Sequence, residues 1–119
     1  MKLVNKSRKK TIAKKVVFAK TPLEKLRGLM FRRKSRFDYA LVFDFGKASK
    51  KMSAIHMLFV FFPIDVVYLR DGIVADVREN VLPFTPYLAP RCNANLLVEL
   101  PAGSVKASGT KLRDFVDFG

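Results

Sequence analysis

Basic side chains crowd the first third of the chain, and their chemistry is the binding of anions. Residues 1–36 hold fourteen Lys and Arg residues against one acid, Glu24, whereas residues 37–119 hold nine bases and nine acids. Such groups bind phosphates, with counterion release driving the affinity. The helix start predicted at Thr21 adds backbone N–H donors for a phosphate. The candidate anion-binding residues are Lys14, Lys15, Lys20, Arg27, Arg32 and Arg33.

The same charge is also typical of a solvated face that carries a basic tail. No base-reading motif accompanies it, and we interpret the neighbouring aromatic residues Phe18 and Phe31 as packing residues. Our leading hypothesis is therefore a binding domain with a non-specific anionic partner, either a nucleic acid or a phosphate-bearing ligand.

Two residues of the central apolar stretch could do acid–base chemistry, His56 and Asp65. A general base needs an orienting partner and a substrate proton within reach, and the sequence offers His56 only the distant Asp65. A buried carboxylate must be paired or hydrogen-bonded, so we expect Asp65 to accept backbone N–H groups near Pro63 or to meet a base such as Arg32. Glu99 receives the same structural interpretation, unless strand alternation turns it outward. An enzyme that uses His56 and Asp65 is the weakest hypothesis.

The chain holds one cysteine, Cys92, and one histidine, which excludes an intrachain disulfide and the usual soft-ligand metal set. The sequence also lacks a glycine-rich phosphate loop and a serine nucleophile elbow. We accordingly expect neither a metal nor a cofactor, and we place no catalytic residue.

A third group of residues suggests a ligand pocket. Residues 82–92 contain three prolines, which predict an irregular loop carrying aromatic side chains. The alternative hypothesis is a barrel that binds a small ligand or a peptide near this loop. The loop could equally fold back over one end of the barrel and plug it. The candidate pocket residues are Arg32, His56, Asp65, Phe84 and Tyr87.

The elements that must position these residues are many short strands and one early helix. Thr21, Pro22 and Glu24 have the types and spacing of a capping box, which predicts a helix over about residues 21–31, with Gly28 near its end. Alternating or continuous apolar runs predict strands at residues 16–18, 39–45, 53–62, 64–70, 73–80 and 95–100. Asp71 and Gly72 predict a hairpin turn. Residues 47–51 are expected to form a polar loop, and residues 103–109 a short capped turn.

This pattern predicts an α+β fold, mainly β, in which an antiparallel sheet closes partly toward a barrel. We divide the chain into a basic arm over residues 1–15, of which residues 1–10 are expected to be mobile or added to a sheet edge, and one barrel-like domain over residues 16–119. No run approaches the roughly 20 apolar residues that span a bilayer, so we expect a cytoplasmic protein without a membrane partner. The absence of Gln and Trp and the abundance of Lys suggest a thermophilic source.

The string from Ala19 to Arg32 is more specific than these patterns. Its centre is the Arg-Gly-Leu-Met-x-Arg element that ends at Arg32, and it is followed by Ala-Leu-Val-Phe-Asp-Phe, Pro-Ile-Asp-Val-Val-Tyr-Leu and Val-Glu-Leu-Pro-Ala-Gly. In this order the chain resembles the family called domain of unknown function 192, from about Val16 to Phe118. The resemblance implies a small, mostly β domain with a barrel-like sheet and an early helix, and it implies no established activity.

One departure and one apparent addition stand out against that resemblance. Many members carry a Trp-Met-Lys-Asn-Thr-like polar string where this chain reads His56-Met57-Leu58-Phe59-Val60. Any site that relies on those polar groups elsewhere in the family is therefore in doubt here. The lysine-rich arm lies mostly outside the matching strings, and we interpret it as this protein's own addition.

Overall fold

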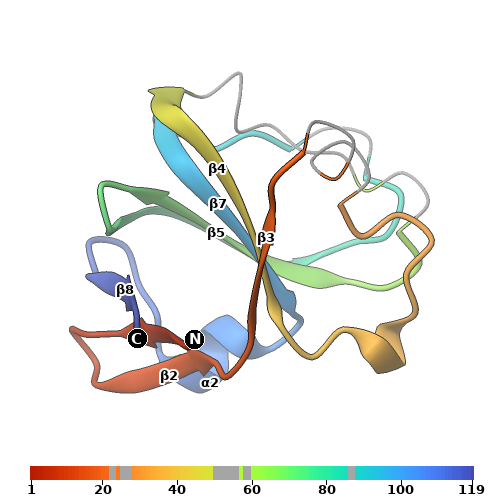
Figure 1. Ribbon diagram of the computed structural model, residues 1–119, viewed down its shortest axis with the longest axis horizontal. Helices are drawn as coiled ribbons and strands as arrows, with labels where there is room; N and C mark the ends of the chain where they lie inside the picture. The colour runs from red at the N-terminus through yellow and green to blue at the C-terminus, as the bar shows by residue number, and fades with distance from the viewer. Residues whose placement is uncertain (22–23, 25–27, 50–56, 58–59, 86–87) are drawn as a thin grey trace.

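Two β-sheets form the framework of the computed structural model, which describes residues 1–119 except 22–23, 25–27, 50–56, 58–59 and 86–87 (Figure 1). The larger sheet has five strands in the order β3 (Val16–Ala19), β4 (Ala40–Ser49), β7 (Ala94–Pro101), β5 (Ile64–Arg70) and β6 (Ile73–Val81). Its β3–β4 pair is parallel and its other pairs are antiparallel. The smaller sheet is antiparallel, in the order β2 (Lys10–Ala13), β1 (Leu3–Asn5) and β8 (Val116–Phe118).

The two sheets are joined at one edge without closing into a barrel. An antiparallel bridge pairs Ile73 with Phe115, and the Val116 N–H donates to the Gly72 carbonyl at 2.8 Å. Lys2 and Gly119 exchange two backbone hydrogen bonds of 2.8 Å, so the two termini lie side by side (Figure 1). The architecture, with two sheets and one short helix among the described residues, confirms the predicted α+β, mainly β class.

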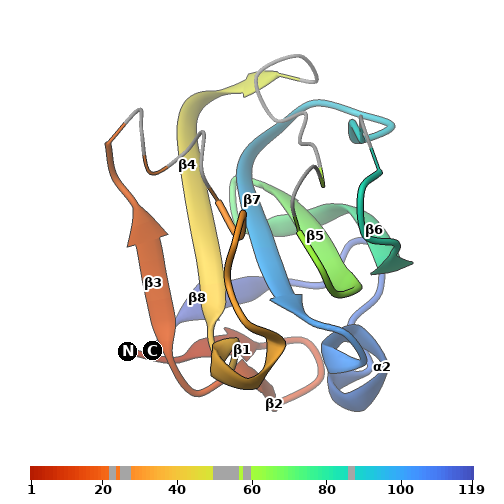
Figure 2. The same ribbon diagram turned by 90° about the vertical axis from the view of Figure 1, so that its right-hand side faces the viewer.

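Apolar cores cover both faces of the larger sheet, which explains its nearly continuous apolar strands. Residues Ile64 to Leu69 of β5 are all buried. On one face, Val42 and Val98 pack with Leu3 of β1 and with Val105 of the short helix α2 (Ser104–Ser108), beside the smaller sheet (Figure 2). On the other face, the core includes side chains from segments outside the strands, among them Leu29, Phe37, Met57 and Phe62.

The predicted basic arm, residues 1–15, contains β1 and β2. Leu3 is buried in the second core, and the buried Asn5 amide donates to Thr110 Oγ1 at 3.1 Å and to Asp114 Oδ2 at 3.0 Å. These contacts make β1 the middle strand of the smaller sheet, so the arm is an ordered part of a sheet. Among the described residues, no helix is long and apolar enough to cross a membrane.

The predicted hairpin turn is confirmed, because Asp71 and Gly72 adopt φ values of 52° and 83° between β5 and β6. The strand predicted over residues 39–45 corresponds to β4, and its predicted end before Gly46 is wrong. Strand β4 runs on to Ser49 through the range expected as a polar loop, with a register shift against β7 between Asp44 and Ser49. Glycine at φ 76° lets the strand bend there without ending.

The Thr21 cap of the early helix is confirmed, whereas the Glu24 carboxylate binds the Lys20 N–H in place of the Thr21 N–H that a capping box uses. Thr21 Oγ1 accepts the Glu24 N–H at 3.0 Å, and the Glu24 carboxylate accepts the Lys20 N–H at 2.8 Å. Gly28 donates to the Glu24 carbonyl at 2.9 Å and then adopts φ 50°. Residues 22–23 and 25–27 lie outside the described residues. The helical hydrogen bonding ends at Gly28, and residues 28–31 form a turn instead of the predicted last turn of helix.

The strand predicted over residues 53–62 is wrong for its described part, while residues 53–56 and 58–59 lie outside the description. Val60 donates to the Met57 carbonyl at 3.1 Å, and the Met57 carbonyl also accepts the Phe84 N–H at 2.9 Å. Met57, Val60 and Phe62 are buried as the apolar run suggested. These three side chains are thus buried in the core although none of the three residues belongs to a strand.

A candidate anion-binding pocket

A short basic segment is held at both ends by buried side chains. Leu29 and Phe37 are 2% and 6% exposed and belong to the core on the loop side of the larger sheet. The Phe37 ring meets the Tyr39 ring edge-on at a centroid distance of 5.1 Å and lies 5.6 Å from that of Phe62. Every residue from 31 to 36 is exposed. Leu29 and Phe37 therefore attach the segment to the core, while the side chains of residues 31–36 are exposed to solvent.

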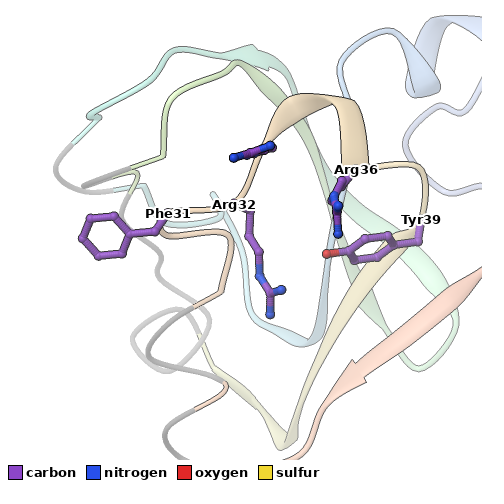
Figure 3. Close-up of a pocket in the computed structure, with 5 residues that line it drawn as sticks. Phe31, Arg32, Arg36 and Tyr39 are labelled. Carbon is purple, nitrogen blue, oxygen red and sulfur yellow. The ribbon is translucent and has the colours of Figure 1, made fainter.

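Three arginines of this segment line one pocket of about 450 Å³, together with Phe31 and Tyr39. We call this set the arginine pocket: Phe31, Arg32, Arg33, Arg36 and Tyr39. A turn of 3-10 helix, η1 (Lys34–Arg36), places Arg36 one turn beyond Arg33, whose carbonyl accepts the Arg36 N–H at 3.1 Å. Figure 3 shows the Arg36 side chain beside the Tyr39 ring, while Phe31 points outward at the edge.

The charged side chains that line the pocket among the described residues are all positive. No acidic side chain is among its described lining residues. The ion pairs within the described part of the chain use other bases, namely Arg8, Lys15, Arg78 and Arg91. Three guanidinium groups of one segment therefore face a shared hollow without an internal counterion from the described residues. A planar guanidinium can bind one phosphate through two parallel hydrogen bonds.

Aromatic rings continue from the edge of the pocket. Phe31, Phe61 and Phe84 are 61%, 57% and 48% exposed, and we call them the aromatic rim. The ring centroids of Phe31 and Phe61 lie 6.4 Å apart, and those of Phe61 and Phe84 lie 5.4 Å apart. The interpretation of Phe31 as a packing residue is wrong, because its side chain is 61% exposed and its ring contacts the exposed Phe61 ring. Phe18 does pack, against Phe118 at 5.4 Å.

A second hollow, of about 510 Å³, shares Arg32 with the arginine pocket and is also lined by Lys20, Glu24, Gly28 and Leu41. Beneath it lies Glu99 of β7, whose neighbours across the sheet are Leu41 and Val66. Glu99 is 4% exposed, and its Oε1 atom accepts no hydrogen bond from the described residues. An ideal Cβ on Gly28 would sit 3.5 Å from that oxygen. Burial raises the pKa of Glu99 to about 8.

Asp65 has a structural role of the predicted kind. Its two carboxylate oxygens accept backbone N–H groups from Asn80 at 2.9 Å, Gly103 at 3.1 Å and Val105 at 2.9 Å. The amides of Gly103 and Val105 belong to the start of α2, so the carboxylate joins this helix to β5 and to the end of β6. These donors differ from the bend at Pro63 and from Arg32, the two partners that the sequence suggested.

The other predicted site residues are dispersed. Arg27, His56 and Tyr87 lie outside the described residues, so a pocket that combines them with Arg32, Asp65 and Phe84 stays a prediction. Lys15 binds Asp38 at 3.0 Å on the surface, Lys14 is exposed, and Lys20 borders the second hollow. Of the six candidate anion-binding residues, the arginine pocket brings together Arg32 and Arg33.

Neither Arg36 nor Glu99 was singled out by the sequence as a site residue. The spacing of Arg33 and Arg36 corresponds to one turn of 3-10 helix, but nothing in the sequence distinguished this turn from a loop. Glu99 carried a stronger signal, because it lies in the run Leu96-Leu97-Val98-Glu99-Leu100. A strand with apolar residues on both faces is covered on both, so alternation could not turn Glu99 to solvent.

The donor set of the described residues does not assemble a metal site, since no group of three His, Cys, Asp or Glu side chains is close enough within it. Cys92 is exposed, and its thiol donates to the Ala75 carbonyl at 3.1 Å. The chemistry that the arrangement supports is the binding of an anion by guanidinium groups beside exposed rings.

The fold and the site together define a small, mainly β domain with an arginine-lined surface pocket. The family model DUF192, described as "Uncharacterized ACR", matches residues 3–118, and the chain belongs to this family. The match includes nearly all of the basic arm. The interpretation of that arm as an addition to the family domain is therefore wrong, in agreement with the burial of Leu3.

Curated relatives come from thermophilic archaea. The chain is 28% identical over 116 residues to a UPF0127 protein of Thermococcus sibiricus, covering 98% of this chain and 73% of the relative. It is also 28% identical over 116 residues to a UPF0127 protein of Pyrococcus furiosus, covering 98% and 97%. These sources agree with the thermophilic character that the composition suggested.

Two solved structures share the fold. One is a Sinorhizobium meliloti protein described as a "putative transcription regulator", with a TM-score of 0.82 and 28% sequence identity, covering 98% of this chain and 89% of that one. The other is a Novosphingobium aromaticivorans protein of unknown function, with a TM-score of 0.77 and 22% identity, covering 87% and 74%. The second likeness concerns the fold alone.

Proposed function

We propose that this protein is a binding module for phosphate-bearing polyanions and that the arginine pocket is its anion site. The observation that carries the proposal is the convergence of Arg32, Arg33 and Arg36 on one hollow without an acidic lining residue in the described structure. Guanidinium groups attract phosphates by charge and fix them by paired hydrogen bonds. The surrounding excess of base in residues 1–36 adds long-range attraction for the same ligands.

Nucleic acid is the favoured phosphate source. Its backbone repeats the phosphate at a spacing that several arginines of one segment can contact at once, and such contacts add through counterion release. The description of the similar Sinorhizobium meliloti protein as a "putative transcription regulator" supports the same class of ligand. The pocket offers positioning contacts to phosphates, which predicts binding with little sequence preference.

The test is the affinity of a fluorescently labelled oligonucleotide for wild-type protein and for three single variants, Arg32→Ala, Arg33→Ala and Arg36→Ala, at low salt. Each phosphate contact releases about 0.7 counterions from a single strand on binding. Loss of one contact should therefore weaken binding nearly tenfold at about 50 mM salt.

The matched control is Arg70→Ala, which removes an exposed arginine at the end of β5 that does not line the arginine pocket. We expect this control to bind within about twofold of wild type, apart from the general effect of net charge. Equal losses for all four variants, or no binding by wild-type protein at low salt, would overturn the proposal.

A further inference from the structure

We propose that the aromatic rim stacks unpaired bases, so that the ligand of the arginine pocket is a single-stranded nucleic acid. This inference rests on the proposed function and adds to it a site for the uncharged bases of the ligand. Phosphates would lie on Arg32, Arg33 and Arg36, and bases on the rings of Phe31, Phe61 and Phe84.

The rim is a row of exposed apolar side chains that begins at the edge of the arginine pocket. Three phenylalanines with exposed fractions of 61%, 57% and 48% contact one another in a row, from three separate segments of the chain. Contiguous exposed apolar side chains mark interaction sites. Successive exposed rings offer flat faces that every base can stack on, whatever its sequence.

The rim and the pocket are continuous through Phe31. Its side chain lines the arginine pocket and also contacts the Phe61 ring, while Figure 3 shows it pointing away from the labelled guanidinium groups. A ligand that spans both surfaces must alternate negative charge with flat aromatic groups. Single-stranded nucleic acid has this chemistry, whereas a duplex hides its base faces and an acidic peptide lacks them.

The backbone holds the rings outward at a cost. Phe31 and Phe84 adopt φ values of 61° and 63°, in the left-handed region that bulky side chains rarely occupy. The Met57 carbonyl accepts the Phe84 N–H at 2.9 Å, and the Met57 N–H donates to the Thr85 carbonyl at 2.6 Å. These two hydrogen bonds fix the Phe84 segment against Met57, which precedes Phe61 in the chain.

The experiment uses the absence of tryptophan from the chain. The Phe31→Trp variant places a single indole in the rim, and stacking of a base on it quenches its fluorescence. The ligands are a short oligodeoxythymidylate, an abasic oligodeoxynucleotide of the same length, and a duplex. A matched oligouridylate identifies whether RNA or DNA is preferred. The control variant Phe115→Trp carries its indole at the bridge between the sheets, where Phe115 is 43% exposed.

We expect oligodeoxythymidylate or oligouridylate to quench the Phe31→Trp fluorescence and to leave Phe115→Trp unchanged. Wild-type protein should bind the abasic strand at least about fivefold more weakly than the intact strand, and Phe84→Ala should narrow that gap without weakening the abasic complex. Equal affinity for intact and abasic strands, without quenching, would overturn base stacking and leave phosphate binding standing. Tighter binding of duplex or of polyglutamate would overturn the single-strand assignment. Failure of every strand to bind would overturn the proposed function itself.

Discussion

Glu99→Gln tests the most unusual electrostatic feature of the fold. The Glu99 side chain is 4% exposed, its Oε1 atom accepts no hydrogen bond from the described residues, and burial raises its pKa from 4.5 to about 8. In the folded protein the carboxyl group therefore stays protonated through neutral pH, whereas in the unfolded chain it ionises above about pH 4.5. The folded state binds the extra proton, so stability must fall as pH rises through this window and level off above about pH 8.

The magnitude follows from the two pKa values. A difference of one pKa unit corresponds to about 1.4 kcal/mol, so this group lowers the free energy of unfolding by about 4 kcal/mol between about pH 5 and pH 9. Water that reaches the carboxylate would reduce this value, which makes it an upper limit. Glutamine has the same shape and no charge at any pH, so the Glu99→Gln variant should lack this component.

The assay is urea unfolding of both proteins at several pH values. The absolute stability of the variant at one pH is uninformative, because its amide needs hydrogen-bond partners of its own. The informative quantity is the difference between the two proteins as a function of pH, in which all shared titrations cancel. We expect this difference to favour the variant increasingly from about pH 5 to pH 8. A difference that does not change with pH would refute the assignment of a neutral, buried Glu99.

Three further predictions concern positions outside the pocket. Asp65→Asn cannot accept all three backbone N–H groups and should lower the free energy of unfolding by about 2 kcal/mol or more; an unchanged urea midpoint would contradict the role given to Asp65. The hydrogen bond from Arg8 lowers the pKa of Asp114 to about 2, so its stabilisation is complete above about pH 4 and lost as pH falls toward 2. Arg8→Ala should raise that pKa toward 3.8, as followed by NMR titration, and an unmoved pKa would oppose this. Gly28→Ala and Gly46→Ala should each cost about 1 to 2 kcal/mol for their positive φ, measured by urea unfolding. A much larger loss for Gly28→Ala would mean that the predicted 3.5 Å contact with Glu99 is too tight.

Local signals in the sequence predicted much of the fold. Thr21 caps the Glu24 N–H as their spacing indicated, and Asp71-Gly72 makes the turn between β5 and β6. Such features depend on neighbouring residues only, so they can be predicted from the order of residue types. The extension of β4 past Gly46 could not be predicted in this way, because pairing with β7 decides it.

The site was harder to predict because it depends on contacts between distant segments. The charge of residues 1–36 indicated an anionic partner and included Arg32 and Arg33, but it did not show which bases converge. Phe31 was interpreted as a packing residue because apolar side chains are usually buried, but its side chain is 61% exposed in the folded chain. Arg8 belonged to the same basic run, yet its hydrogen bond to Asp114 gives it a structural role.

The salt dependence of binding tests the central claim most directly. The measurement compares the slope of log affinity against log salt concentration for wild-type protein and for the triple variant Arg32→Ala, Arg33→Ala, Arg36→Ala with a single-stranded oligonucleotide. If the three arginines contact three phosphates, the triple variant should have a slope shallower by about 2. Identical slopes for the two proteins would contradict the account, because the phosphates would then be bound elsewhere on the chain.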